Sequence, residues 1–170
     1  DRRRGALLQF GRGGFADVAD MWHQRGLAQL LHPLPMAVAA GAAPIAARLA
    51  GEADPYPDAR PDDLELLGYD IDAADRPVFR YRVGEALIYD HYRPSDDSLE
   101  LVRSIRAEQG SDGLYCLLAA ADYIEPVGNG YYSVGGRYYL RLLRPPAEAL
   151  LRQQGGQTEL LYPLTASKIG

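Results

Sequence analysis

The stretch that most constrains the fold covers residues 64–92 and reads LELLGYDIDAADRPVFRYRVGEALIYDHY. Within it, residues 77–83 and 86–92 alternate apolar and polar side chains, and only Gly84 and Glu85 separate the two runs. A Gly-X pair between two such runs is typical of a type II′ β-hairpin turn. The pattern therefore predicts three short antiparallel strands over residues 64–92, with Val83 paired to Ala86.

This predicted register sorts the side chains of the hairpin into two faces, because side chains alternate along a strand. One face is mostly apolar and is expected to lie against the core; it holds Phe79, Tyr81, Val83, Ala86, Ile88 and Asp90. The other face sets Arg80 and Arg82 beside Leu87 and Tyr89, where arginine stems can cover apolar area. Arg80, Arg82 and Tyr89 are therefore candidates for a ligand or partner surface.

Strand-like patterns continue to the end of the chain. They predict further strands over residues 98–106, 114–121, 131–134, 137–143 and 158–164, with Arg103 as the one side chain that breaks its alternation. Strands at regular spacing, with short turns and no intervening helices, indicate a sandwich or barrel. We expect a mainly β chain whose residues 63–170 form an antiparallel β-sandwich.

Residues 1–62 differ in kind, since they are rich in Ala, Gly and Pro. They predict an irregular, partly helical segment or linker, with a strand over residues 6–10 and a helix over residues 16–31. The prolines of residues 54–61 indicate an extended connector to the β region. Because the chain opens on Asp1 without a methionine, we expect a fragment of a longer protein or a processed form.

Charge and composition exclude several classes of protein. A net charge of −5 argues against a dedicated nucleic-acid binder. The single cysteine, Cys116, allows neither a disulfide framework nor a cysteine-based zinc or haem-attachment motif. The apolar run at residues 34–50 is interrupted by Pro35, Pro44 and Arg48 and is too short to cross about 30 Å of hydrocarbon, so no membrane span is expected.

One motif suggests a cofactor. Residues 11–16 fit G-x-G-x-x-A, the pattern of a dinucleotide-binding turn. No acidic residue closes a second strand about 20 residues further on, where such a site requires one, because the sequence there reads Leu-Leu-His-Pro. A flexible glycine loop is the favoured interpretation, and no cofactor is expected in this chain.

The residues suited to metal or acid–base chemistry show no recognised spacing; they are His23, His32, His91, Asp90, Asp122 and Glu125. Asp90 and His91 are neighbours on a predicted strand and should point to opposite faces. Cys116 lies in an apolar run and is expected to be a small core residue instead of a nucleophile. We therefore assign no catalytic and no metal-binding residue and favour a non-catalytic role.

Tyrosine is unusually frequent, with twelve in the chain. Gly135 and Gly136 predict a two-residue hairpin in which Val134 pairs with Arg137 and Tyr132 pairs with Tyr139 on one face. Aromatic platforms can hold sugars, but alternating tyrosines also pack as cross-strand pairs, which is the favoured interpretation. Tyr132 and Tyr139 complete the set of candidate surface residues.

The order of several motifs resembles a known module. They are GYDID at 68–72, RPVFRY at 76–81, YD at 89–90, residues 99–105, IE at 124–125, GYYSVGGRY at 130–138 and ELLYPL at 159–164. This succession, over about residues 64–164, is similar to a β module of large, secreted, multidomain proteins from planctomycete- and verrucomicrobia-type bacteria, which carry c-type cytochrome modules elsewhere. The chain lacks Cys-x-x-Cys-His, so haem binding is not carried over to any residue, and no catalytic residue is transferred.

The resemblance implies a non-catalytic scaffold or interaction module of an exported, redox-associated bacterial protein, located outside the cell or in the periplasm. Its implied partners are neighbouring domains of a larger protein, including haem-bearing domains used in electron transfer. The alternative is a carbohydrate-binding or carbohydrate-active β-sandwich that acts on an extracellular polysaccharide. An arginine-rich outer face would favour a partner domain, and exposed tyrosines with carboxylates nearby would favour a sugar.

Overall fold

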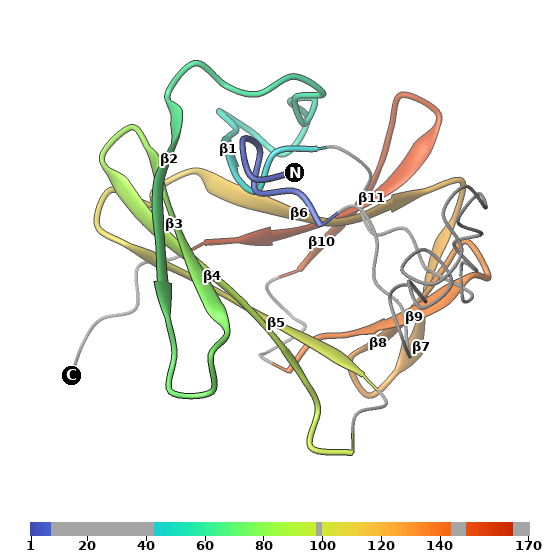
Figure 1. Ribbon diagram of the computed structural model, residues 1–170. Coiled ribbons are helices and arrows are strands. Elements are labelled where there is room, and N and C mark those ends of the chain that lie inside the picture. The colour runs from blue at the N-terminus through green and yellow to red at the C-terminus, as the bar shows by residue number, and fades with distance from the viewer. Residues whose placement is uncertain (8–42, 98–99, 144–148, 165–170) are drawn as a thin grey trace, which may run out of the picture.

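The computed structural model describes residues 1–7, 43–97, 100–143 and 149–164 (Figure 1). These residues form β-strands and no helix, and every strand pairing among them is antiparallel. The strands are β1 (Ala47–Arg48), β2 (Leu64–Ile71), β3 (Pro77–Val83), β4 (Ala86–Pro94), β5 (Leu101–Glu108), β6 (Leu114–Ala121), β7 (Ile124–Gly128), β8 (Tyr131–Val134), β9 (Tyr138–Arg141), β10 (Leu150–Gln154) and β11 (Gln157–Pro163). The prediction of a mainly β, antiparallel chain is confirmed.

The strands build three sheets. One has the order β2-β3-β4-β5, a second has the order β1-β6-β11-β10, and a small third sheet has the order β7-β8-β9. In Figure 1 strands β2–β4 lie at the left, β6 and β11 run across the middle, and the β7–β9 sheet lies at the right. The first sheet is a simple meander, because each strand pairs with the next one along the chain.

The β3–β4 hairpin has the register expected from its sequence. Val83 pairs with Ala86, and Tyr81 pairs with Ile88. Gly84 has a φ of 59°, the positive value that the first central position of a type II′ turn requires. The face predicted to be apolar is buried, with Tyr81, Val83, Ala86 and Ile88 at most 2% exposed.

The main core cluster contains side chains from both four-stranded sheets. Leu64, Val83 and Ile88 come from the β2–β5 sheet, and Leu114 and Cys116 come from β6. Cys116 is buried in this cluster, as expected for a small core residue, and burial raises the pKa of its thiol to about 11. A further cluster joins the second sheet to the small sheet through Ala119, Ile124, Tyr132, Val134 and Leu160.

The predicted register of the β8–β9 hairpin is wrong by one residue. Both glycines of its turn have positive φ, as expected, and the Arg137 amide donates to the Val134 carbonyl at 3.0 Å. Strand pairing nevertheless resumes only at Tyr138, which lies opposite Val134. Arg137 therefore belongs to the turn, and the loop contains three residues instead of two.

This shift has a packing cause. It places Tyr132 opposite Leu140 and Ser133 opposite Tyr139. A shift of one residue moves every side chain of a strand to the other face, so Tyr138 and Leu140 pack against the core beside Tyr132. Tyr132 is consequently 8% exposed and Tyr139 is 71% exposed, which corrects the prediction that the two share a face.

The remaining strand predictions differ from the structure in detail. The strand predicted over residues 98–106 is β5, which continues to Glu108, and residues 98–99 lie outside the described residues. The strand predicted to end at residue 143 ends at Arg141, and the last strand is Gln157–Pro163. Strands β1, β7 and β10 were not predicted.

Part of the segment 1–62 contributes to the packed structure. Ile45 and Tyr56 are buried, and the Tyr56 hydroxyl donates to the Pro44 carbonyl at 2.9 Å. In the described part of this segment only β1 is a strand, so residues 6–7 are not. The predicted helix at 16–31, the glycine motif at 11–16, His23 and His32 lie outside the described residues, and the domain division at residues 62 and 63 stays a prediction.

Candidate functional site

The outer side of the β2–β5 sheet carries three of the five candidate surface residues. Strand alternation places them in two cross-strand rows, Arg82–Leu87–Glu108 and Arg80–Tyr89–Arg106. We call this surface, with Glu65 added from β2, the arginine face. Arg80, Arg82 and Tyr89 thus lie together, as the hairpin register predicted.

Neighbouring side chains hold each guanidinium group of the arginine face in place. Arg82 forms an ion pair with Glu65, the residue directly opposite on β2. Arg80 Nε lies 3.2 Å from Asp70 Oδ2, and Arg106 forms an ion pair with Glu108. The Arg106 guanidinium also lies 4.1 Å from the centroid of the Tyr89 ring, within range of a cation–π interaction. The arginine face therefore carries charges of both signs, and each of its arginines is paired with a neighbouring carboxylate.

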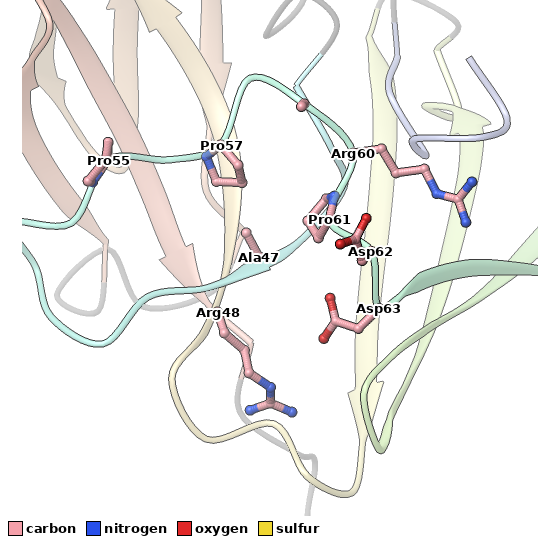
Figure 2. Close-up of a pocket in the computed structure, with 9 residues that line it drawn as sticks. Ala47, Arg48, Pro55, Pro57, Arg60, Pro61, Asp62 and Asp63 are labelled. Carbon is pink, nitrogen blue, oxygen red and sulfur yellow. The ribbon is translucent and has the colours of Figure 1, made fainter.

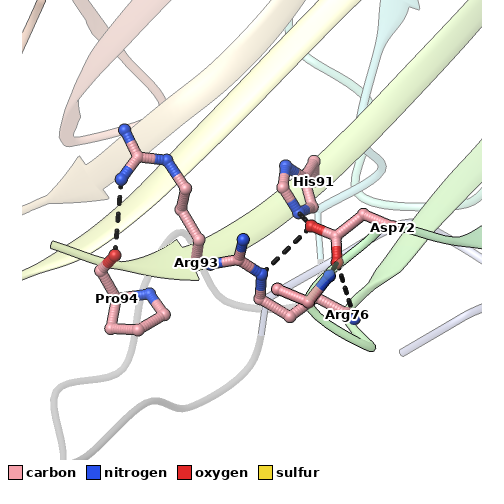
Figure 3. Close-up of polar contacts among 6 residues, drawn as sticks. Asp72, Arg76, His91, Arg93 and Pro94 are labelled. Atoms are coloured by element: carbon pink, nitrogen blue, oxygen red, sulfur yellow. Dashed lines mark hydrogen bonds and ion pairs between the residues drawn. The ribbon is translucent and has the colours of Figure 1, made fainter. Parts of the chain in front are cut away.

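Beside this face, Asp72 organises the turn between β2 and β3. Its Oδ1 accepts hydrogen bonds from the backbone amides of Ala74 at 2.8 Å and Arg76 at 2.9 Å. Its Oδ2 lies 3.0 Å from both Arg76 Nε and His91 Nε2. Figure 3 shows His91 and Arg76 converging on this carboxylate, while Arg93 extends toward the Pro94 carbonyl.

The electrostatics of Asp72 follow from these contacts. The backbone hydrogen bond from Arg76, aided by those from Ala74 and the Arg76 side chain, lowers the pKa of the carboxyl to about 2. The carboxylate is therefore ionised at neutral pH and poorly suited to accept a proton. We interpret the group as a structural clasp for the turn, not as a general base.

Asp90 and His91 point to opposite faces, as predicted, and only Asp90 enters the core. Asp90 is 1% exposed and accepts two hydrogen bonds from Arg103, Nε to Oδ1 at 2.8 Å and Nη2 to Oδ2 at 3.0 Å. Arg103 Nη2 also donates to the Gly5 carbonyl at 3.1 Å. The ion pair thereby fastens residues 1–7 to the β2–β5 sheet.

Two tyrosines surround this buried pair. Tyr92 lies opposite Arg103, whose guanidinium is 5.1 Å from the ring centroid. Burial raises the pKa of Tyr92 above its ordinary range, and burial together with the Asp90 charge raises that of Tyr81 to about 12. Both phenols stay protonated at neutral pH. We interpret the cluster as a structural anchor, because Arg103 also holds the backbone at Gly5.

The other two candidate residues are separated. Tyr132 lies in the core, whereas Tyr139 lies on the solvent side of the β7–β9 sheet. Ser133 is directly opposite Tyr139, and Glu125 is opposite Ser133 on the next strand. On the same side the Arg141 guanidinium is 5.1 Å from the centroid of the Tyr131 ring. This group combines exposed aromatic surface with charged and hydroxyl groups.

A hollow of about 400 Å³ lies beside β1 (Figure 2). Its walls are mainly proline and alanine, with four charged residues; the lining is Ala47, Arg48, Pro55, Pro57, Ala59, Arg60, Pro61, Asp62 and Asp63. Arg48 donates to the carbonyls of Gly110 and Asp112, and Arg60 Nε donates to the Leu64 carbonyl at 2.8 Å. Both arginines thus fix neighbouring backbone, and no Ser, Thr, Cys or His side chain lines the hollow.

Metal binding finds no support in the described part of the chain, where no three His, Cys, Asp or Glu side chains are grouped to hold an ion. The same residues contain no helix long and apolar enough to cross a membrane. Comparisons with protein-family models, curated proteins and solved structures gave no match.

Proposed function

We propose that this chain is a non-catalytic interaction module whose arginine face contacts a neighbouring domain of a larger, exported, redox-associated protein. The arginine face itself is the observation that carries the proposal. Its three guanidinium groups are held by Glu65, Asp70, Glu108 and the Tyr89 ring. Side chains that are already ordered lose little entropy on binding, and arginine is enriched at protein interfaces.

The proposal includes a β-sandwich, in which the two four-stranded sheets pack face to face. Support comes from the main core cluster, which includes Ile88 from one sheet and Leu114 from the other. A sandwich holds its outer sheet faces rigidly, because the inner faces interdigitate. A rigid outer face suits a scaffold that positions a second domain.

The ionisable groups near the β2–β5 sheet support a role without catalysis. Asp90 and Arg103 saturate each other, and Asp72 is fixed by its own turn. Cys116 has neither exposure nor a neighbouring histidine among its core contacts. The proposal accordingly includes no cofactor and no catalytic residue in this chain.

The proposed partner class is a c-type cytochrome domain whose contact surface carries charges of both signs, because each arginine of the arginine face is paired with a carboxylate. The test is an NMR titration of the ¹⁵N-labelled chain with such a domain at low ionic strength. We expect shifts confined to the outer sides of β3, β4 and β5, and a Kd about tenfold weaker after Arg80→Glu with Arg82→Glu.

Arg3→Glu is the matched control, because Arg3 belongs to the segment that Arg103 anchors on the opposite side of the sheet. It should leave the Kd unchanged. No binding of the cytochrome domain, or shifts that avoid the arginine face, would contradict the proposal.

Carbohydrate binding is the second candidate, and a specific observation favours it. Tyr139 is 71% exposed, and Ser133 and Glu125 continue its row across the β7–β9 sheet. Exposed aromatic rings stack on the apolar faces of sugars, and carboxylates accept hydrogen bonds from sugar hydroxyls. This candidate uses a surface separate from the arginine face, so the two functions can be tested independently.

A further inference from the structure

The solvent side of β9 presents an alternating set of large side chains. Tyr139 and Arg141 are two residues apart on the strand and are both exposed, while Tyr138 and Leu140 pack against the core. Arg137, in the turn just before the strand, is exposed as well. We call Arg137, Tyr139 and Arg141 the β9 strip.

The two arginines of the β9 strip differ from those of the arginine face. Arg80, Arg82 and Arg106 each form an ion pair with a carboxylate. Neither Arg137 nor Arg141 does so within the described residues, although Arg141 stacks on Tyr131. A stacked guanidinium keeps its N–H donors free in its plane. In the part of the chain that the structure describes, the strip therefore offers two exposed arginines without a carboxylate partner, one before and one after the exposed Tyr139 in the sequence.

Charge complementarity then calls for a ligand with repeated negative charges. Strand β9, from Tyr138 to Arg141, is about 10 Å long, and Arg137 lies just before it in the turn, so the two arginines would meet anionic groups on different units of a chain molecule. Tyr139 lies between them and provides a ring for stacking. The spacing fits a polymer whose rigid, apolar-faced units carry an anionic group each.

The row of residues opposite Tyr139 favours a saccharide over a nucleic acid as the ligand. Glu125 and Ser133 lie in register with Tyr139 and suit hydroxyl groups, which both donate and accept hydrogen bonds. A sugar unit presents several hydroxyl groups beside its anionic group, whereas a nucleotide unit presents a phosphate and at most one ribose hydroxyl. A ligand with several hydroxyls beside its anionic groups therefore matches both this row and the two arginines.

We propose that the β9 strip binds an anionic polysaccharide of the uronic acid type, with Tyr139 stacked on one sugar and Arg137 and Arg141 on carboxylates of flanking sugars. This inference rests on the carbohydrate-binding candidate above and specifies its ligand class. It predicts binding that weakens with salt, because the arginine contacts are electrostatic and exposed.

The test is calorimetric titration with galacturonate oligosaccharides, with neutral gluco-oligosaccharides of equal length and with oligothymidylate. The acidic sugar should bind at least about tenfold more tightly than the neutral one. Arg137→Ala with Arg141→Ala should remove that preference and the salt dependence. Tyr139→Ala should weaken the binding of the acidic sugar, while Tyr139→Phe should retain it because the ring remains.

Arg80→Ala with Arg82→Ala is the matched control and should bind the acidic sugar like the parent chain. The melting temperature of every variant should stay close to that of the parent, since all five side chains lie on solvent-facing surfaces. A loss of sugar binding in this control would contradict the location of the site.

The remaining outcomes separate the inference from the candidate on which it rests. Equal binding of acidic and neutral sugars would overturn the anionic ligand class and leave carbohydrate binding standing. Binding of neither sugar would overturn both. Oligothymidylate binding that is tighter than galacturonate binding and is lost in the Arg137 and Arg141 variant would assign the strip to nucleic acid and overturn the inference.

Discussion

The arginines of the β2–β5 sheet and those of β9 lie on similar strand surfaces but differ in what holds them. Arg82 meets Glu65 directly across a strand pair, and Arg106 meets both Glu108 and the Tyr89 ring. Arg141 meets only the Tyr131 ring, and Arg137 sits in a turn without a carboxylate partner in the described residues. We infer that an arginine without a carboxylate partner keeps more of its charge available to an anionic ligand than a paired arginine does.

The buried pair of Asp90 and Arg103 is the extreme case of a paired arginine. Arg103→Ala leaves the Asp90 charge buried without compensation and should reduce the free energy of unfolding by about 3–5 kcal/mol. Urea unfolding followed by circular dichroism measures this loss. The double variant Asp90→Leu with Arg103→Met should recover much of it, because no charge then remains buried. A loss below about 1 kcal/mol in Arg103→Ala would show that the pair is not desolvated.

The turn that carries the β9 strip should be the next most sensitive place. Gly135 and Gly136 have φ values of 55° and 63°, where β-branched residues are strained. Replacing both by Val should cost about 1–2 kcal/mol per site and lower the melting temperature by several degrees. Gly51→Val is the control, because Gly51 has no positive φ and no atom within 4 Å of an added Cβ. Equal midpoints for both variants would contradict the turn geometry.

The Asp72 clasp should be visible as a pH dependence. Its carboxyl pKa falls from 3.8 to about 2 on folding, so its contribution is present above pH 3.8 and is lost as the pH falls toward 2. The melting temperature of the parent chain should exceed that of Asp72→Asn at neutral pH, and the difference should shrink through this acidic window. Thermal melts at a series of pH values measure it. A difference that stays constant down to pH 2 would argue against the lowered pKa.

The smallest effect should come from the exposed pairs themselves. A double-mutant cycle on Arg82 and Glu65 should give a coupling energy of about 0.2–1 kcal/mol, because both groups are exposed to water and salt. Arg137→Ala, which removes no ion pair among the residues that the structure describes, should change the unfolding free energy by less than about 0.5 kcal/mol. Urea midpoints of the single and double variants give both values. A large loss for Arg137→Ala would mean that this arginine is part of the packing.

The two glycine hairpins show what local sequence can and cannot specify. Gly84 with Glu85 fits one turn type, and the predicted register of β3 and β4 is correct. Gly135 with Gly136 fits a turn as well, but the extra loop residue Arg137 is decided by the packing of Tyr138 and Leu140 against a distant strand. The sequence of the turn does not indicate that contact, and the sequence-based prediction therefore puts Tyr132 and Tyr139 on one face.

The sequence predicts the burial of Asp90 but not its pairing with Arg103. Asp90 was placed correctly on the core face, and Arg103 was noticed as a misfit in its strand. Their pairing depends on the register of β4 against β5, in which Tyr92 lies opposite Arg103. No short glycine turn joins these strands, so their register could not be predicted. The sequence does not predict strand β10 for a related reason. The strand pairs with β11, where Arg152 lies opposite Glu159 and forms an ion pair with it, and this pairing cannot be read from either strand alone.

The most direct measurement of the contrast between paired and unpaired arginines is an NMR titration that follows the arginine Nε–H signals while galacturonate oligosaccharide is added. We predict saturable shifts of the Arg137 and Arg141 signals, with those of Arg80, Arg82 and Arg106 unchanged. Shifts of the Arg80, Arg82 and Arg106 signals, with no change in those of Arg137 and Arg141, would contradict this prediction.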